Sequence, residues 1–200
     1  MKTVIKVVLA ALLVVGVLPI AAQEGPQPSG YLSHQGVEVP VAFFYPSTWT
    51  VVDQDDGVGL VSRPGLAEQM DADQPDIQTG DALLALGVMP AMFIEMMGAD
   101  IDDLENVMDV LHSNIDAESG DVRGSDRASH SYASRDVVSI LFDTTEADAA
   151  GLMFVSRESE DVLAFGIAFG ERNDLAAYRD ELGQVIASME FTGSMEDFFR

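Results

Sequence analysis

A methionine-rich stretch is the part of this sequence whose side chains suggest chemistry most directly. Met89 to Met97 reads Met-Pro-Ala-Met-Phe-Ile-Glu-Met-Met and holds a single charged residue. Methionine is flexible and polarizable, so it suits adaptable apolar contacts, and its thioether is a soft ligand for Cu(I). Three interpretations are open: a short helix buried on two sides, a surface for a protein partner or an apolar ligand, and a copper site. We favour burial, because a surface helix normally has a polar face and this one has only Glu95. The candidate binding residues under the second interpretation are Met89, Met92, Phe93, Met96 and Met97.

Two acidic segments are spaced in a way that suggests calcium. They are Asp53 to Gly57 and Asp71 to Asp76. The first departs from the EF-hand pattern, because its glycine comes one place early and Pro64 stands where the bidentate glutamate should be. The second has no glycine. A solvated acidic turn is the favoured interpretation, with weak calcium binding as the alternative. We assign no metal ligand and no cofactor.

The residue types of covalent hydrolases are sparse. The chain has no cysteine and no Gly-x-Ser-x-Gly elbow, and its two lysines are Lys2 and Lys6. His34, His112 and His130 fall on an expected linker, helix and strand, with no paired spacing. We therefore expect a protein that is not an enzyme. A hydrolase whose site is assembled only in three dimensions is the alternative.

The elements that must position these residues follow from apolar periodicity and turn residues. Strands are predicted at residues 37–45, 49–53, 57–63, 81–89, 128–134, 137–143, 151–157 and 162–169, with a last short strand at 190–192. Helices are predicted at residues 90–97, 102–114 and from Asn173 or Asp174 to residue 189, and Asp102 with Glu105 resembles a capping box. Short connections between consecutive strands favour an antiparallel sheet. The prediction is an α+β fold, an α/β/α-type sandwich with one central antiparallel sheet of about six to eight strands and about three helices.

Two stretches carry a resemblance to a known family. Phe43-Phe44-Tyr45-Pro46-Ser47-Thr48-Trp49 is a strand that ends in Tyr-Pro, followed by a tryptophan and a hairpin. Ile186-Ala187-Ser188-Met189-Glu190-Phe191 closes the domain with a serine, a large apolar residue and an aromatic. Together they resemble the PsbP-like family over residues 37–192. The resemblance implies a central antiparallel sheet between helical layers. The family includes a photosystem subunit, a nuclear-transport factor and many exported bacterial proteins of unknown role, so it implies no shared catalytic site.

The charge of the chain limits its partners. It has 34 acidic residues against 10 lysines and arginines, a formal net charge of −24. Such a chain repels nucleic acid and anionic membrane surfaces, so we expect neither as a partner. Because the acids are scattered, a solvated shell is the favoured interpretation, and binding of cations or basic partners is the alternative. We expect a monomer whose partner is an unknown protein or an apolar ligand.

The first residues have the features of an export signal. Lys2 and Lys6 precede an apolar run from Val7 to Val17, and small residues around Ala22 offer a cleavage site. An uncleaved membrane anchor is the alternative. The predicted organisation is a signal peptide at residues 1–22, a flexible linker at 23–36, the PsbP-like domain at 37–192 and a C-terminal tail at 193–200. We expect a secreted, periplasmic or cell-envelope protein, an acidic and cysteine-free accessory or binding module.

Overall fold

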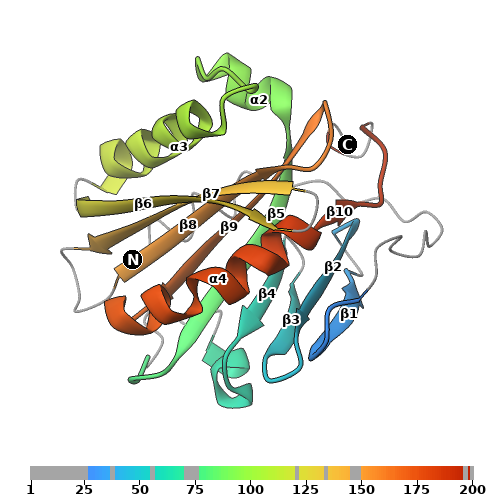
Figure 1. The fold of residues 1–200 in the computed structure, drawn as a ribbon, viewed down its shortest axis with the longest axis vertical. Coiled ribbons are helices and arrows are strands. Elements are labelled where there is room, and N and C mark those ends of the chain that lie inside the picture. The colour runs from blue at the N-terminus through green and yellow to red at the C-terminus, as the bar shows by residue number, and fades with distance from the viewer. Residues whose placement is uncertain are drawn as a thin grey trace.

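Two antiparallel sheets and three α-helices make up the fold in the computed structural model, which describes residues 27–36, 39–54, 57–69, 77–119, 122–132, 135–144, 150–195 and 198. The larger sheet has seven strands in the order β3-β4-β5-β9-β8-β7-β6 (Figure 1). The smaller has three, in the order β1-β2-β10. The predicted α+β sandwich is confirmed, and the larger sheet lies within the predicted range of strands. Strands β2 and β10 of the smaller sheet fall on predicted strands, but β1 and the existence of a second sheet were not predicted.

The strands of the larger sheet follow the apolar segments of the sequence. Their bounds are β3 (Thr50–Gln54), β4 (Gly57–Val61), β5 (Ala82–Pro90), β6 (Val122–Tyr132), β7 (Arg135–Thr144), β8 (Ala150–Arg157) and β9 (Val162–Gly170). A 3-10 helix, η1 (Pro64–Gln69), follows β4. Strand β6 begins well before its predicted start at Ala128. The pairing of β5 with β9 joins segments far apart in the sequence and sets Pro90 opposite Val162.

The smaller sheet corrects the predicted linker. Tyr31–Gln35 form strand β1, which pairs with β2 (Val41–Pro46), so this part of residues 23–36 is not a flexible linker. Strand β2 begins after Pro40, since proline cannot donate to a strand ladder and the predicted strand from residue 37 is interrupted there. Strand β10 (Glu190–Phe191) pairs with the other edge of β2. In the predicted tail, the ring of Phe198 stacks on Phe191 at a centroid distance of 4.7 Å.

Each face of the larger sheet has its own cover. Helix α4 (Arg172–Ser188) and the smaller sheet lie on one face, and α2 (Ala91–Met96) and α3 (Leu104–Ser119) lie on the other (Figure 1). Strand β8 shows the alternation that this requires. Leu152 and Phe154 pack in the cluster that contains α4, whereas Met153 and Val155 pack in the cluster that contains α3.

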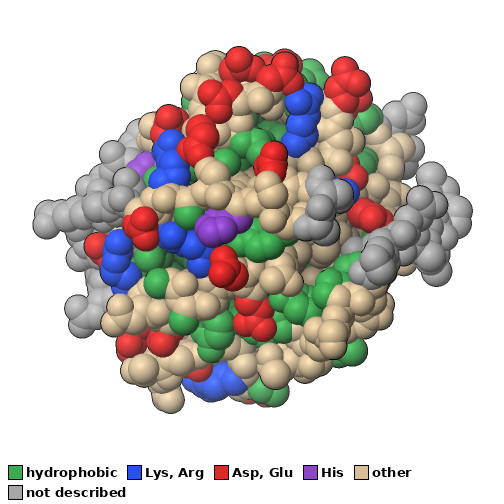
Figure 2. Space-filling model, viewed as in Figure 1, with side chains coloured by type: hydrophobic (Ala, Val, Ile, Leu, Met, Phe, Trp, Pro, Cys, Tyr) green, Lys and Arg blue, Asp and Glu red, His purple; other side chains and the backbone are tan. Residues whose placement is uncertain are grey.

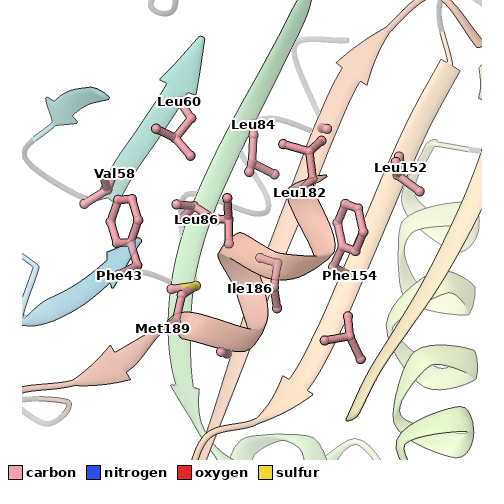
Figure 3. Close-up of a cluster of buried hydrophobic side chains, with 14 of the residues drawn as sticks. Phe43, Val58, Leu60, Leu84, Leu86, Leu152, Phe154, Leu182, Ile186 and Met189 are labelled. Atoms are coloured by element: carbon pink, nitrogen blue, oxygen red, sulfur yellow. The ribbon is translucent and has the colours of Figure 1, made fainter. Parts of the chain in front are cut away.

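The core under α4 holds the larger and smaller sheets together. Phe43 of β2 lies among Val58, Leu86 and Met189, and all four side chains are buried (Figure 3). Trp49, the only tryptophan, is also buried and meets Tyr178 edge to face at a centroid distance of 5.2 Å. The turn between β2 and β3 that carries Trp49 is therefore part of the core.

The two stretches that carry the family resemblance lie against one another. The Oγ of Ser188 accepts a hydrogen bond from the backbone N–H of Phe44 at 2.9 Å and contacts the Phe44 carbonyl at 3.3 Å. Next to it, Phe191 of β10 pairs with Val41 of β2. The two stretches that resemble the PsbP-like family thus form one contact between the beginning and the end of the domain. We call this contact of Phe44 with Ser188 and of Val41 with Phe191 the joint.

The helix starts differ from the predicted caps. The side chain of Asp103, not Asp102, caps α3, because its Oδ1 accepts hydrogen bonds from the N–H groups of Glu105 at 3.0 Å and Asn106 at 3.3 Å. Asp102 pairs instead with Arg157 at 2.6 Å. Helix α4 starts at Arg172, one residue before the predicted range, with Glu171 at its N-cap.

A buried ion pair fixes the loop that enters β5. The carboxylate of buried Asp81 accepts hydrogen bonds from Arg63 Nε at 2.7 Å and Nη2 at 2.8 Å, and from the N–H of Gln78 at 2.8 Å. The hydrogen bonds from Arg63 lower the pKa of Asp81, against the opposing effect of burial. The pair therefore stabilises the ionised form of Asp81.

We expect Asp81→Asn to lower the free energy of unfolding by about 1–2 kcal/mol near neutral pH, a value reduced by the partial exposure of Arg63 to water. Because the native pKa lies below the unfolded value of about 3.9, this contribution is present above that pH and is lost as the pH falls through the native pKa. Urea midpoints of the wild type and the variant should therefore converge in acid. A gap of constant size down to the lowest pH would contradict this account.

The predicted signal peptide, residues 1–22, lies outside the described residues. No helix in the described part of the chain has both the length and the apolar character needed to cross a membrane.

Candidate functional site

Helix α2 is short but is held at both ends. At its start, the N–H of Ala91 donates to the carbonyl of Asp161 in the turn between β8 and β9, at 2.8 Å. At its end, the N–H of Gly98 donates to Glu95 at 2.8 Å and that of Ala99 donates to Ile94 at 3.2 Å. Gly98 has φ of +92°, so these two bonds form a Schellman motif with glycine at the left-handed position. The helix therefore presents its side chains in a fixed orientation.

One side of α2 contacts the core and the rest faces outward. Ala91 and Ile94, three residues apart, are buried. The exposed fractions of the others are 44% for Met92, 37% for Phe93, 77% for Met96 and 44% for Met97. These four residues are called the α2 patch. Burial on two sides, the favoured interpretation of the sequence, is therefore wrong. A helix of six residues can turn only about two side chains, three or four positions apart, toward the sheet. Its other apolar side chains therefore extend away from the core.

Met89 does not belong to the α2 patch. It lies near the end of β5, is buried, and packs in the same cluster as Ile94 under α3. Met97 has one weak polar neighbour, since Asn114 Nδ2 of α3 lies 3.7 Å from its sulfur. Four of the five residues predicted as candidate binding residues are thus brought together at the surface, and the fifth is part of the core.

A cavity of about 550 Å³ adjoins the α2 patch, and most of its charged side chains are acidic. We call it the acidic cavity, and its lining includes Met92, Glu95, Asp100, Arg157, Glu160 and Asp161. The charge of Arg157 is matched by Asp102 at 2.6 Å. The antiparallel register that sets Pro90 opposite Val162 brings Glu160 and Asp161 beside the start of α2. The sequence does not indicate that these residues lie close together, because it does not reveal that β5 pairs with β9.

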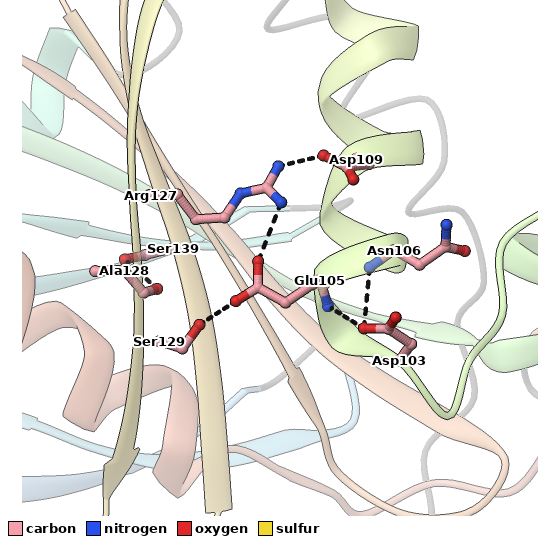
Figure 4. Close-up of polar contacts among 8 residues, drawn as sticks. All are labelled: Asp103, Glu105, Asn106, Asp109, Arg127, Ala128, Ser129 and Ser139. Carbon is pink, nitrogen blue, oxygen red and sulfur yellow. Dashed lines mark hydrogen bonds and ion pairs between the residues drawn. The ribbon is translucent and has the colours of Figure 1, made fainter.

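A second hollow lies between α3 and strands β6 and β7, and its polar groups bond to one another. Glu105 of α3 accepts hydrogen bonds from Arg127 Nη1 at 3.0 Å and from the hydroxyl of Ser129, and Arg127 also binds Asp109 (Figure 4). The hydrogen bond from Arg127 lowers the pKa of Asp109, and the same contact raises the pKa of Arg127. These contacts tie α3 to the edge of the sheet and leave Ser129 bonded to a carboxylate.

His130 and the serines that line this hollow have carboxylates as their polar partners. The Nδ1 of His130 lies 4.0 Å from Asp180 of α4, while Ser131, which lines the same hollow, donates to Asp136. The polar partners of His34 and His130 are aspartates, Asp53 and Asp180, and not serine hydroxyls. Burial and the nearby Asp180 raise the pKa of Tyr132 to about 12, so this phenol is protonated at neutral pH. Both serine hydroxyls that line this hollow, those of Ser129 and Ser131, are bonded to carboxylates.

The acidic segments considered for calcium are only partly visible. Asp53 is bonded to His34, whose Nε2 lies 3.0 Å from its Oδ1, and Asp55, Asp56 and residues 71–76 lie outside the described residues. Within the described part of the chain, no group of three or more His, Asp or Glu residues is placed to hold a metal ion.

His112 of α3 packs edge to face on Phe142 at a centroid distance of 5.7 Å.

Comparison with known proteins gives similarities of fold only. No family model matches the sequence, and no curated protein matches it. Among solved structures, cyanobacterial PsbP (CyanoP) from Synechocystis is similar at 14% identity over 88% of this chain and 99% of that one, with a TM-score of 0.45. LpqN of Mycobacterium tuberculosis, described as involved in cell envelope biogenesis, is similar at 9% identity over 82% of this chain and 91% of that one, with a TM-score of 0.42. One of these similar structures is therefore a PsbP. The PsbP-like family is also the one that the two stretches of the sequence resemble.

Proposed function

We propose that the chain is an exported, non-enzymatic binding module of the cell envelope or extracellular space, and that the α2 patch is its contact surface. One observation carries the proposal: four large apolar side chains are exposed side by side on a helix whose two ends are fixed. Soluble monomers rarely leave such a contiguous apolar patch open unless it binds something. Methionine makes such a surface adaptable to partners of different shape.

Two further features support this kind of protein. The N-terminal sequence around Lys2, Lys6 and the apolar run that follows is typical of an export signal. The polar hollow beside α3 has its serine hydroxyls bonded to carboxylates, which favours a structural role over hydrolysis. The occupant of the α2 patch is a protein or an apolar ligand, and the module itself is a monomer.

The proposal is tested by removing the apolar surface without touching the core. We expect the double variant Met92→Ser/Met96→Ser to change the free energy of unfolding by about 1 kcal/mol or less, because Met96 is largely exposed and Met92 is nearly half exposed. The same variant should lose most of the fluorescence gained by the neutral apolar dye Nile red on binding to the protein.

Leu32 provides the matched control, because it is 45% exposed on β1 of the smaller sheet. Leu32→Ser should leave the Nile red signal unchanged. A large fall in the urea midpoint of the methionine variant would mean that these side chains stabilise the fold. An unchanged dye signal would mean that the α2 patch is not the apolar contact surface. Either result overturns the proposal.

A further inference from the structure

Unpaired carboxylates surround the α2 patch. Glu95 lies on α2 itself, Asp100 follows it, and Glu160 and Asp161 form the adjacent turn, and all four are exposed. In the described part of the chain, none of the four is in an ion pair. In the view of Figure 2, acidic side chains gather at the end of the molecule that carries α2. An apolar surface is therefore bordered by negative charge that the fold does not neutralise.

The arginines are used elsewhere. Every arginine whose side chain the structure describes pairs with an acid: the pairs are Arg63–Asp81, Arg127–Glu105 and Asp109, Arg135–Glu158, Arg157–Asp102, Arg172–Asp143 and Arg179–Asp126. Most of these pairs hold a helix or a loop to the larger sheet. Among the described residues that line the acidic cavity, Arg157 is the single arginine, and Asp102 matches its charge. The negative potential beside the α2 patch is therefore available to a ligand.

We infer that the α2 patch binds a cationic amphipathic segment of a protein partner, an inference that rests on the proposed function. The apolar side of such a segment would lie on Met92, Phe93 and Met96, and its lysine or arginine side chains would reach the acidic cavity. The contact pairs apolar surface with apolar surface and positive charge with negative charge. Complementary charge of this kind selects the partner and its orientation as well as adding affinity. Amphipathic segments that dock on methionine-rich surfaces are a recurring mode of peptide recognition.

Other occupants fit this surface less well. A second copy of the chain would bring two acidic borders together, and like charges set against each other oppose association. Anionic lipid headgroups and nucleic acid are repelled for the same reason. A neutral apolar ligand would satisfy the α2 patch and leave the surrounding carboxylates without a role.

The test uses two designed helical peptides of equal length with identical leucine positions. One has lysine at its polar positions and the other has glutamine. Binding of each labelled peptide to the purified protein is measured by fluorescence anisotropy. We expect the lysine peptide to bind about tenfold or more tightly than the glutamine peptide, and expect added NaCl to reduce this difference through screening.

Because the whole chain is acidic, a local effect must be separated from general attraction. The variant Glu95→Gln/Glu160→Gln removes two charges beside the α2 patch. The control Glu68→Gln/Glu181→Gln removes the same charge from η1 and from α4, which lie away from α2 (Figure 1). We expect the first variant to abolish the preference for the lysine peptide and the control to retain it.

The outcomes separate this inference from the proposed function. If both glutamine variants lose the preference for the lysine peptide, or if the wild type binds the two peptides equally, the inference of a cationic partner is wrong. The α2 patch would then remain as an apolar contact surface. Binding of both peptides that is unaffected by Met92→Ser/Met96→Ser overturns the proposed function as well. A concentration-dependent dimer in sedimentation that this methionine variant dissociates would assign the surface to a second copy and overturn the inference.

Discussion

Replacing Gly151 with alanine should lower the free energy of unfolding by about 2–4 kcal/mol, a large cost for one methyl group. A Cβ at this position would lie 2.2 Å from Cζ of Phe142, and its three nearest neighbours are all atoms of that ring. The two residues face each other across β7 and β8, and Phe142 is fully buried with His112 packed against it. The ring lies over the glycine and is buried in the cluster under α3, so it can make room for a methyl group only by displacing its neighbours.

A double-mutant cycle in urea checks this explanation. Phe142→Leu alone should cost about 1–2 kcal/mol, and in the double variant the cost of Gly151→Ala should shrink because the ring that it displaces is gone. Gly65→Ala is the control. There a Cβ would approach only Nη1 of Arg63, at 3.0 Å, so the change should cost clearly less than Gly151→Ala, about 1 kcal/mol or less. Additive costs in the double variant would show that the contact with Phe142 is not the cause.

Replacing Phe43 with alanine should lower the free energy of unfolding by about 3–5 kcal/mol, since it leaves a cavity in a fully buried site. The ring packs between the smaller sheet, strands β4 and β5 and the end of α4 (Figure 3). Its loss should therefore weaken the whole domain. Phe93→Ala removes the same side chain from the exposed side of α2 and should cost much less free energy of unfolding. It therefore serves as the control for Phe43→Ala.

The measurement for Phe43→Ala is urea unfolding followed by two signals. Trp49 is the only tryptophan and shares the cluster of Phe43, so its fluorescence reports on the joint between the sheets. Far-ultraviolet circular dichroism reports on the whole fold. We expect the two curves to shift together, as in a cooperative transition. If the fluorescence midpoint falls and the circular dichroism midpoint does not, the smaller sheet unfolds by itself and the prediction is wrong.

Most elements of the larger sheet could be predicted from the sequence, because each apolar strand is bounded by turn residues. Their pairing could not. Nothing local in Ala82–Pro90 or Val162–Gly170 indicates that these strands are neighbours, yet this pairing builds the acidic cavity. The smaller sheet was missed because β1, with sequence Tyr-Leu-Ser-His-Gln, has no apolar period. Strand β1 forms because it pairs with β2, and such pairing is a tertiary contact that the local sequence does not encode.

The candidate site was half predicted. The sequence identified the methionine stretch but favoured the wrong environment, because a two-turn helix that is apolar all round fits burial and exposure equally well. Met89 was assigned to the site with its neighbours, whereas the change from β5 to α2 at Pro90 turns it toward the core. The carboxylates beside the α2 patch come from two segments some 60 residues apart, and only the fold brings them together.

The joint between Phe44 and Ser188 also affects when the chain can fold. Strand β2 obtains its partner β10 and the Ser188 hydroxyl only after almost the whole chain has been made, since these groups are 144 residues apart. Contacts that close such long loops form slowly, because the entropy of closure must be overcome before the contact stabilises the chain. A nascent chain therefore cannot complete its core while its C-terminal helix is still missing. Under the export that we propose, the chain would cross a membrane as an unfolded polypeptide, and this delay would keep it in a state that the export machinery can thread.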